Sequence, residues 1–343
     1  MKNRLKTLAL TAALFAAAVP AVAQTATTNV TLYGLLDVYV QHGKGTATGW
    51  ALQSGGQSGS RLGVRGSEDL GGGLSAVFTL ENGIAADTGT VTQGGVFWGR
   101  QAFLGLSSKE WGALTAGRQY SPHFFASVAN DIFGTGVGGG FASFVTTTVF
   151  RVDNSVTYEL PKIAGVLGGS VMQSAGEGGA AGTKATSAHL RYASGPAGLS
   201  LAYLQRNTVE KQKLLSLAGS YDFKVVKLVA GWQDVKNLTG ALGAADDRRE
   251  VWLQAAIPVS ASGTVQLGAA QAKASGATGK DAKQWTAGYS HALSKRTNLY
   301  AIYTQVDNGT ATNYTTGGAT GAGPAVTAGV DATALTFGVR HSF

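Results

Sequence analysis

The feature that most constrains the fold is an alternation of apolar and polar residues that recurs along most of the chain. A period of two places successive side chains on opposite faces of a β-strand. The clearest instance ends the chain, where one face carries Leu335, Phe337, Val339, His341 and Phe343. The pattern predicts an all-β protein whose strands are apolar on one face and polar on the other.

Sixteen such segments are expected, from residues 29–42 to residues 335–343, joined alternately by short and long connections. Short turns on one side and longer loops on the other are typical of barrels in the outer membrane. Lipid offers no hydrogen bonds to an open sheet edge, so the sheet must close. We therefore expect a transmembrane antiparallel 16-stranded β-barrel. A soluble β-sandwich is the alternative, which the consistent polarity of one face disfavours.

The chain begins with the pattern of an export signal. Lys2, Arg4 and Lys6 precede an apolar stretch over residues 8–19, and small residues follow at Ala21 and Ala23. The apolar stretch is shorter than the roughly 20 residues that a membrane-spanning helix needs. The expected organisation is a signal peptide at residues 1–23 and a barrel domain at residues 24–343.

Composition excludes several classes of protein. The chain has Cys 0, so it has no disulfide scaffold and no thiolate metal site. Its five histidines lie outside any catalytic or metal-ligand motif. The formal net charge of +8 is spread along the chain with no basic run, which argues against a nucleic-acid partner. No catalytic, cofactor-binding or metal site is expected.

One connection is unusually long, running from Tyr120 to Asp153. Connections of this length are uncommon unless they are functional. It contains several glycines together with apolar residues such as Phe124, Phe125 and Phe133, which indicate that it packs against something. We expect this third long loop to fold into the barrel and narrow the pore. A surface loop is the alternative.

Five arginines are the candidate functional residues: Arg61, Arg65, Arg100, Arg118 and Arg151. A permanently charged side chain on the lipid face costs about 2–4 kcal/mol at the membrane midplane. These arginines are therefore expected to face the pore, where a shared positive wall would favour anions. The alternation around Arg100 is poor, and scattered charges without a common constriction remain an alternative.

Aromatic residues near strand ends are expected to form girdles at the two membrane–water boundaries. They are Tyr33, Trp111, Tyr192, Tyr221, Phe223, Trp232, Tyr300 and Phe343.

The segments VTLYGLLDVYV, SRLGVRGSEDLGGGLSAVFTLE, GRQAFLGLSS, LTAGRQY, NSVTYELP and the terminal FGVRHSF resemble the general-diffusion porins of β-proteobacteria. The resemblance implies a homotrimeric porin of the cell outer membrane, in contact with its lipid, that passes ions and small hydrophilic solutes, commonly with anion preference. It also implies a constriction with Arg61, Arg100 and Arg151, with Arg118 nearby. The terminal Phe343 would be the signal read by the barrel-assembly machinery.

The tip of the third loop departs from the family pattern. Many relatives carry an acidic, proline-containing motif there, whereas this chain has Asp131-Ile132-Phe133-Gly134 followed by glycines. The acidic side of the constriction would then be limited to Asp131 and Asp153, which favours anions.

Two other functions were weighed against the passive channel. An outer-membrane enzyme would need a paired nucleophile and base, and no such pair is apparent in the sequence. A substrate-specific channel or a loop-borne adhesin stays open, although no run of aromatic residues along the pore wall is seen.

Overall fold

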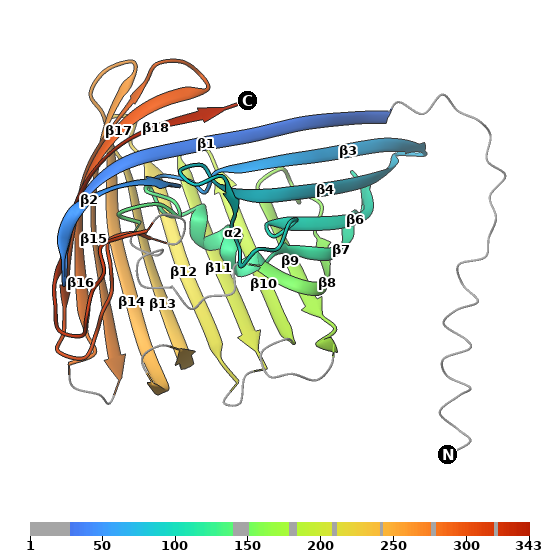
Figure 1. Cartoon of the computed structure of the whole chain (residues 1–343). Coiled ribbons are helices and arrows are strands. Elements are labelled where there is room, and N and C mark those ends of the chain that lie inside the picture. Colours follow the sequence, from blue (N-terminus) through green and yellow to red (C-terminus); the bar gives the residue numbers. More distant parts are fainter. Residues whose placement is uncertain are drawn as a thin grey trace.

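The computed structural model describes residues 28–139, 151–177, 184–207, 211–240, 243–275, 279–318 and 322–343. The expected signal peptide, residues 1–23, lies outside these ranges. Within them, sixteen strands form one antiparallel barrel (Figure 1). They are β1 (Thr28–Lys44), β3 (Arg61–Gly71), β4 (Leu74–Ala85), β6 (Gln101–Ser108), β7 (Gly112–Tyr120), β8 (Arg151–Glu159), β9 (Leu167–Ser174), β10 (Ala185–Ser194), β11 (Ala197–Arg206), β12 (Lys213–Asp222), β13 (Lys227–Gly240), β14 (Gly243–Pro258), β15 (Gly263–Ser275), β16 (Ala282–Ala292), β17 (Thr297–Asn308) and β18 (Ala332–Ser342).

The first and last strands close the barrel. β1 pairs with β18 from Leu35–Ser342 to Lys44–Thr333, and the start of β1 pairs with β3. Each of the sixteen strands thus has two hydrogen-bonded neighbours, which removes the open edge that lipid would not tolerate. The predicted fold, a closed antiparallel 16-stranded barrel, is confirmed.

The first long connection is more ordered than predicted. It contains β2 (Thr48–Ser54), which pairs with the second half of β1 and continues the line of β3. A second short strand, β5 (Thr90–Val91), pairs with β4. The segment between β2 and β3 is held by the buried Asp37, whose Oδ2 accepts hydrogen bonds from the backbone N of Gln57 and Ser58, both at 2.7 Å.

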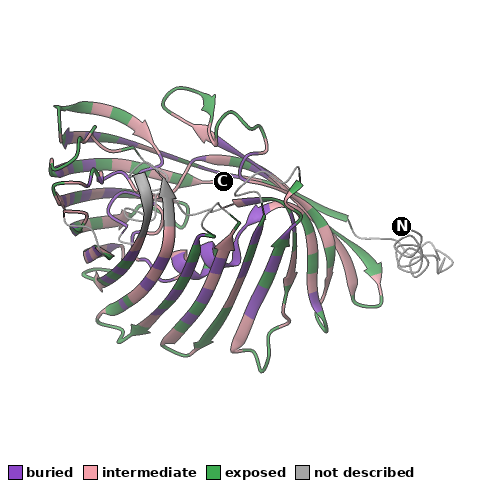
Figure 2. Ribbon diagram, turned by 90° about the horizontal axis from the view of Figure 1, so that it is seen from below, coloured by how far each residue is buried: buried purple, intermediate pink, exposed green. Residues whose placement is uncertain are grey.

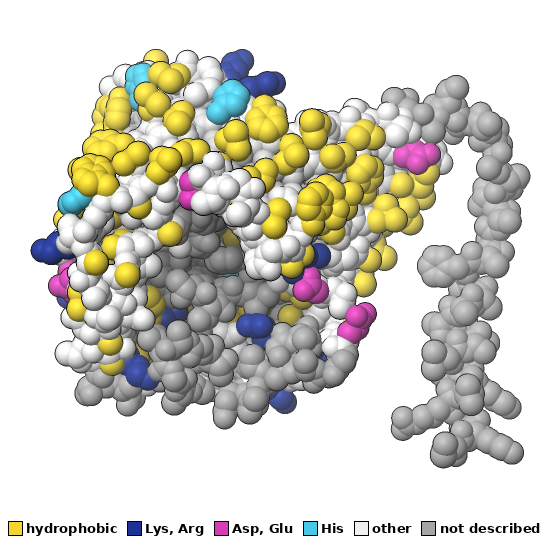
Figure 3. All heavy atoms as spheres, in the orientation of Figure 1, with side chains coloured by type: hydrophobic (Ala, Val, Ile, Leu, Met, Phe, Trp, Pro, Cys, Tyr) yellow, Lys and Arg dark blue, Asp and Glu magenta, His cyan; other side chains and the backbone are white. Residues whose placement is uncertain are grey.

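The alternation places side chains as the sequence predicts. In β1, Val30 and Leu32 are 56% and 63% exposed, while Asp37, Tyr39 and Gln41 on the other face are almost completely buried. Figure 3 shows apolar side chains gathered on the outside of the barrel wall.

The predicted aromatic girdle needs two corrections. Trp111, Tyr192, Tyr221, Phe223 and Phe343 are each more than 40% exposed on the outer surface. Tyr33 and Tyr300 point inward instead, because each donates a hydrogen bond to a carboxylate of the interior: Tyr33 to Glu81 at 3.0 Å and Tyr300 to Asp37 at 2.6 Å.

The long third loop begins with a short helix, α2 (Pro122–Val128), which lies inside the curved sheet (Figures 1 and 2). Ser121 caps it by accepting a hydrogen bond from the backbone N of Phe124, and Pro122 starts its first turn. The helix packs against β9, β10, β11 and β12. Residues 140–150, the middle of this loop, lie outside the described ranges.

Among the described residues, no helix has the length and apolar character needed to cross a membrane.

Candidate functional site

Arginines converge on Tyr120, the last residue of β7. The Tyr120 hydroxyl accepts hydrogen bonds from Nη2 of Arg100 at 2.6 Å and from Nη2 of Arg151 at 2.8 Å. The Arg151 guanidinium carbon also lies 4.5 Å from the centre of the Tyr120 ring, within the range of a cation–π contact. One tyrosine therefore holds two guanidinium groups together that would otherwise repel each other.

A single carboxylate balances part of this charge. Glu81 Oε1 lies 2.7 Å from Arg100 Nε, and both side chains are only 4% exposed. Arg61 donates to the carbonyl of Gly59 at 2.9 Å and interacts electrostatically with Arg100, Arg151 and Glu81. These five residues, Arg61, Arg100, Arg151, Tyr120 and Glu81, are called the arginine cluster below. With three guanidinium groups and one carboxylate, the cluster has an excess of positive charge.

An irregularity of the sheet sets the position of Arg151. The pairing of β7 with β8 shifts between Gly117 and Gln119, which brings Arg151 opposite Tyr120. Gly117 has φ +136°, and a Cβ there would lie 2.2 Å from the carbonyl oxygen of Ala102. Bulges of this kind redirect side chains beside functional sites, and the β7 residue opposite this one requires glycine.

Tyr120 lies at the boundary between two cavities. The first, about 350 Å³, is lined by Arg100 and Arg151 together with loop residues such as Asp87 and Gln93. The second, about 640 Å³, is lined by residues nearer the short turns, including Ser67, Ala113 and Glu159. Tyr120 lines both. The arginine cluster thus borders both cavities: Arg100 and Arg151 line the one on the side of the long loops, and Tyr120 also lines the one on the side of the short turns.

The other predicted arginines lie apart from the cluster. Arg65 lies towards the short-turn side, with its guanidinium carbon 5.2 Å from the ring of Tyr33. Arg118 pairs with Asp153, whose side chain is 64% exposed, and donates to the carbonyl of Gly99. The sequence named both as constriction residues. Arg65 lines the same cavity as Tyr120, but the two arginines that donate to the Tyr120 hydroxyl are Arg100 and Arg151.

Asp131 also lies away from the arginines, on the opposite wall. Its Oδ1 accepts hydrogen bonds from Gln254 at 2.8 Å and from the backbone N of Phe133 at 2.9 Å. The backbone N of Ile132 donates to Gln254 at 2.6 Å. In these contacts Asp131 anchors the third loop to β14.

Helix α2 is anchored to the same side of the barrel through His123. Its backbone N donates to Ser187 at 3.1 Å, and its Nε2 lies 2.7 Å from the hydroxyl of Ser216. Burial lowers the pKa of His123 from 6.5 to about 4, since the charged imidazolium would lose its hydration there. At neutral pH this histidine is therefore an uncharged part of the loop anchor.

Two residues of the cluster escaped the sequence analysis. Glu81 has the same strand parity as Thr79, and β4 pairs Glu81 with Gly63, two residues from both Arg61 and Arg65. The alternation therefore indicated which face of β4 Glu81 occupies, but the pairing register with β3 was needed to place it beside the arginines. Tyr120 was seen only as the start of a loop, because its role depends on Arg151, 31 residues later.

The C-terminal Phe343 extends the pairing between the first and last strands. Its backbone N and O exchange two hydrogen bonds, each 3.0 Å, with Gly34. Its ring stacks on His341 and is 46% exposed. Within the described residues, no three His, Asp or Glu side chains gather as a metal site.

Comparison with known proteins places this arrangement in a family. Residues 9–312 match the model of the Gram-negative porin family. The chain is 32% identical to an outer membrane porin protein of Bordetella pertussis, over 82% of this chain and 90% of the relative. It is 31% identical to outer membrane porin protein 32 of Delftia acidovorans, over 96% and 98%.

A solved structure agrees with the sequence relatives. The anion-selective porin from Comamonas acidovorans superposes with a TM-score of 0.80 at 29% identity, covering 92% of this chain and all (100%) of that one. The chain therefore belongs to the Gram-negative porin family and forms an outer-membrane β-barrel.

Proposed function

We propose that this porin is a passive diffusion channel for ions and small hydrophilic solutes, and that it prefers anions. The observation that carries the proposal is the arginine cluster at the boundary between the two cavities. A solute crossing that boundary passes a positive excess held in a protein interior, where screening by water is weaker than in bulk.

The anchored third loop supports an off-centre constriction. Helix α2 and residues 130–139 are hydrogen-bonded to inner residues of β10, β12, β14 and β16. These contacts fill that side of the barrel, so the free passage runs along β3 to β8, where the arginines lie. Size exclusion and the field of the arginines then act at the same place, as expected for a selective pore.

Passage requires only weak, reversible contacts. An anion entering the constriction exchanges part of its water shell for guanidinium N–H groups, and it leaves because no site binds it tightly. Arg100 contributes less than the others, since Glu81 neutralises it. The field on a passing anion therefore comes mainly from Arg61 and Arg151.

The family resemblance supports three further parts of the proposal. Residues 1–23 would be removed as a signal peptide on export. Phe343 would serve barrel assembly. Three copies would associate through the apolar outer faces of the first strands, where Leu32 and Leu104 are each 63% exposed.

Liposome swelling and planar bilayers test the proposal together. Vesicles containing the purified protein should admit small neutral sugars at rates that fall steeply with sugar size. Under a KCl gradient, the same protein should give a reversal potential whose sign shows that chloride is more permeant than potassium. Uptake of one sugar only would contradict general diffusion, and a potassium-preferring potential would contradict the role of the arginines.

A further inference from the structure

An aromatic ring faces the larger cavity inside the barrel. Phe125 of α2 is 50% exposed, whereas its neighbour Phe124 is buried and stacks on Tyr120 at 4.5 Å between ring centres. The Phe125 ring meets Tyr120 edge-on at 5.6 Å. Outer strand faces expose apolar residues to lipid, but Phe125 lies within the barrel and lines the 640 Å³ cavity. Half a ring exposed to water is a surface on which another ring can stack.

A charged group without a counter-ion lines the same cavity. Arg65 is exposed and, among the described residues, forms no ion pair with a carboxylate. Arg100 and Arg118 differ, since each is paired with an acidic residue. The contact that positions Arg65 is the ring of Tyr33, which leaves its N–H groups available. A guanidinium in this state can bind a carboxylate through two parallel hydrogen bonds.

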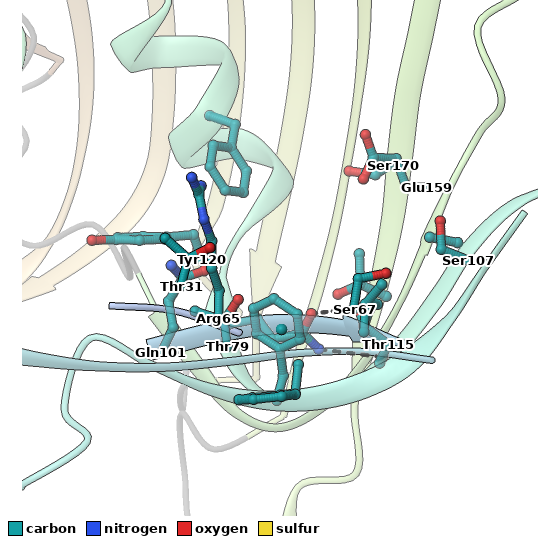
Figure 4. Close-up of a pocket in the computed structure, with 18 of the residues that line it drawn as sticks. Thr31, Arg65, Ser67, Thr79, Gln101, Ser107, Thr115, Tyr120, Glu159 and Ser170 are labelled. Carbon is teal, nitrogen blue, oxygen red and sulfur yellow. Dashed lines mark hydrogen bonds between the residues drawn. The ribbon is translucent and has the colours of Figure 1, made fainter. Parts of the chain in front are cut away.

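The cavity joins these two features. It is lined by Arg65, Phe125, Phe103 and Tyr120, with hydroxyl and amide side chains between them. Figure 4 shows Arg65, Thr79 and Gln101 gathered near Tyr120, with Glu159 away from them on the other side. The volume suits a small organic molecule, and the distant Glu159 would repel a carboxylate and direct it towards Arg65.

We propose that this cavity is a transit subsite for aromatic carboxylates, with the carboxylate on Arg65 and the ring against Phe125. The inference rests on the proposed channel function and adds a class of solute to it. Phe103 and Tyr120 provide further aromatic surface along the path. An aromatic anion that has passed the arginine cluster pauses here before it leaves on the short-turn side.

Channel block by three sodium salts tests the subsite. Benzoate, cyclohexanecarboxylate and acetate are added to single channels in KCl, and the concentration that halves the chloride current is recorded. Stacking between aromatic rings predicts that benzoate blocks at about three- to ten-fold lower concentration than cyclohexanecarboxylate, which has the same charge and similar size. Acetate should be the weakest. Equal block by the two ring acids would overturn the inference.

Variants separate the two contacts. Phe125→Leu keeps an apolar side chain and should abolish the advantage of benzoate over cyclohexanecarboxylate. Arg65→Gln should weaken block by both ring acids about ten-fold, because each loses a charge-assisted pair. Arg206→Gln, which removes an arginine that does not line this cavity, is the matched control and should leave the ratio unchanged.

The KCl reversal potential of each channel is measured in the same bilayers. If the wild type prefers chloride but does not distinguish the ring acids, the subsite is wrong and the channel function stands. If it prefers potassium, the proposed anion preference itself is wrong. A variant that fails to insert gives no KCl conductance, and for Phe125 the second variant Phe125→Ala then replaces it.

Discussion

The inner surface of the barrel has two unlike halves. Along β3 to β8 the arginine cluster carries excess positive charge beside two cavities. Along β10 to β16 the inward side chains are mainly uncharged apart from the buried Arg248–Glu250 pair, and several of them form hydrogen bonds to the third loop. This loop-anchoring wall comprises Ser187, Ser200, Ser216, Gln254 and Gln284.

The two halves show that the direction in which a side chain points does not decide its role. The same alternation points both sets of side chains inward, yet one set lies beside the two cavities and the other holds a loop. The loop takes the wall that offers matched neutral donors and acceptors, because a backbone group buried without a partner costs about 1–3 kcal/mol. In the proposed channel, the passage then runs along the other wall, whose charges need water or anions.

The largest predicted effect is on stability, at the buried pair of the arginine cluster. Glu81→Gln leaves Arg100 buried without its counter-ion, which should lower the free energy of unfolding by about 3–5 kcal/mol. Urea unfolding of the barrel in vesicles measures it. Asp153→Asn is the control, because the exposed Arg118–Asp153 pair should contribute only about 0–1 kcal/mol. Equal losses would show that the cluster is not buried in the way described.

The next effect concerns pH and the loop-anchoring wall. His123 takes up a proton near pH 6.5 in the unfolded chain. In the folded protein it does so only near pH 4, because burial lowers its pKa. Stability contributed by neutral His123 is therefore complete above about pH 6.5 and falls as the pH drops to about 4, by about 3 kcal/mol.

Carboxylates also titrate in this interval, so the variant His123→Gln supplies the reference. Urea unfolding at pH 7 and pH 4 should show a smaller loss for the variant than for the wild type. Identical losses of unfolding free energy in the two proteins would show that His123 is not a pH-sensitive part of the loop anchor.

A smaller effect is expected at the contact between the third loop and β14. Gln254→Ala removes the partner of Asp131 and of the Ile132 backbone N, at a cost of about 1–3 kcal/mol. The freed loop should make the single-channel current noisier. Gln305→Ala is the control, because Gln305 lies near the end of β17 and its side chain donates to Asp307 of the same strand. A quiet current from the Gln254 variant would mean that other contacts suffice to hold the loop.

Much of the fold was predictable because a barrel in lipid leaves few choices. Alternation at period two, the even strand number and the requirement for closure together define the architecture. The strand now called β2 was missed because Gly49 and Gly55–Gly56 made residues 43–59 resemble an open loop, while its pairing depends on register with β1.

The site was only partly predictable, for a related reason. Parity indicated that Arg61 and Arg65 share a face, but it could not place them at different depths of the pore. The contact of Arg151 with Tyr120 depends on a bulge, and that of Asp131 with Gln254 joins residues 123 positions apart. Such contacts come from register and loop packing, which local periodicity does not encode.

The central claim is that Arg61 and Arg151 set the anion preference of the pore. Its most direct test is the KCl reversal potential of the wild type and of the double variant Arg61→Ala/Arg151→Ala. Arg206→Gln is the control, because it removes a positive charge elsewhere in the barrel. The wild type and the control should both prefer chloride, whereas the double variant should lose most of that preference while conducting more current through a wider opening. An unchanged chloride preference in the double variant would contradict the account.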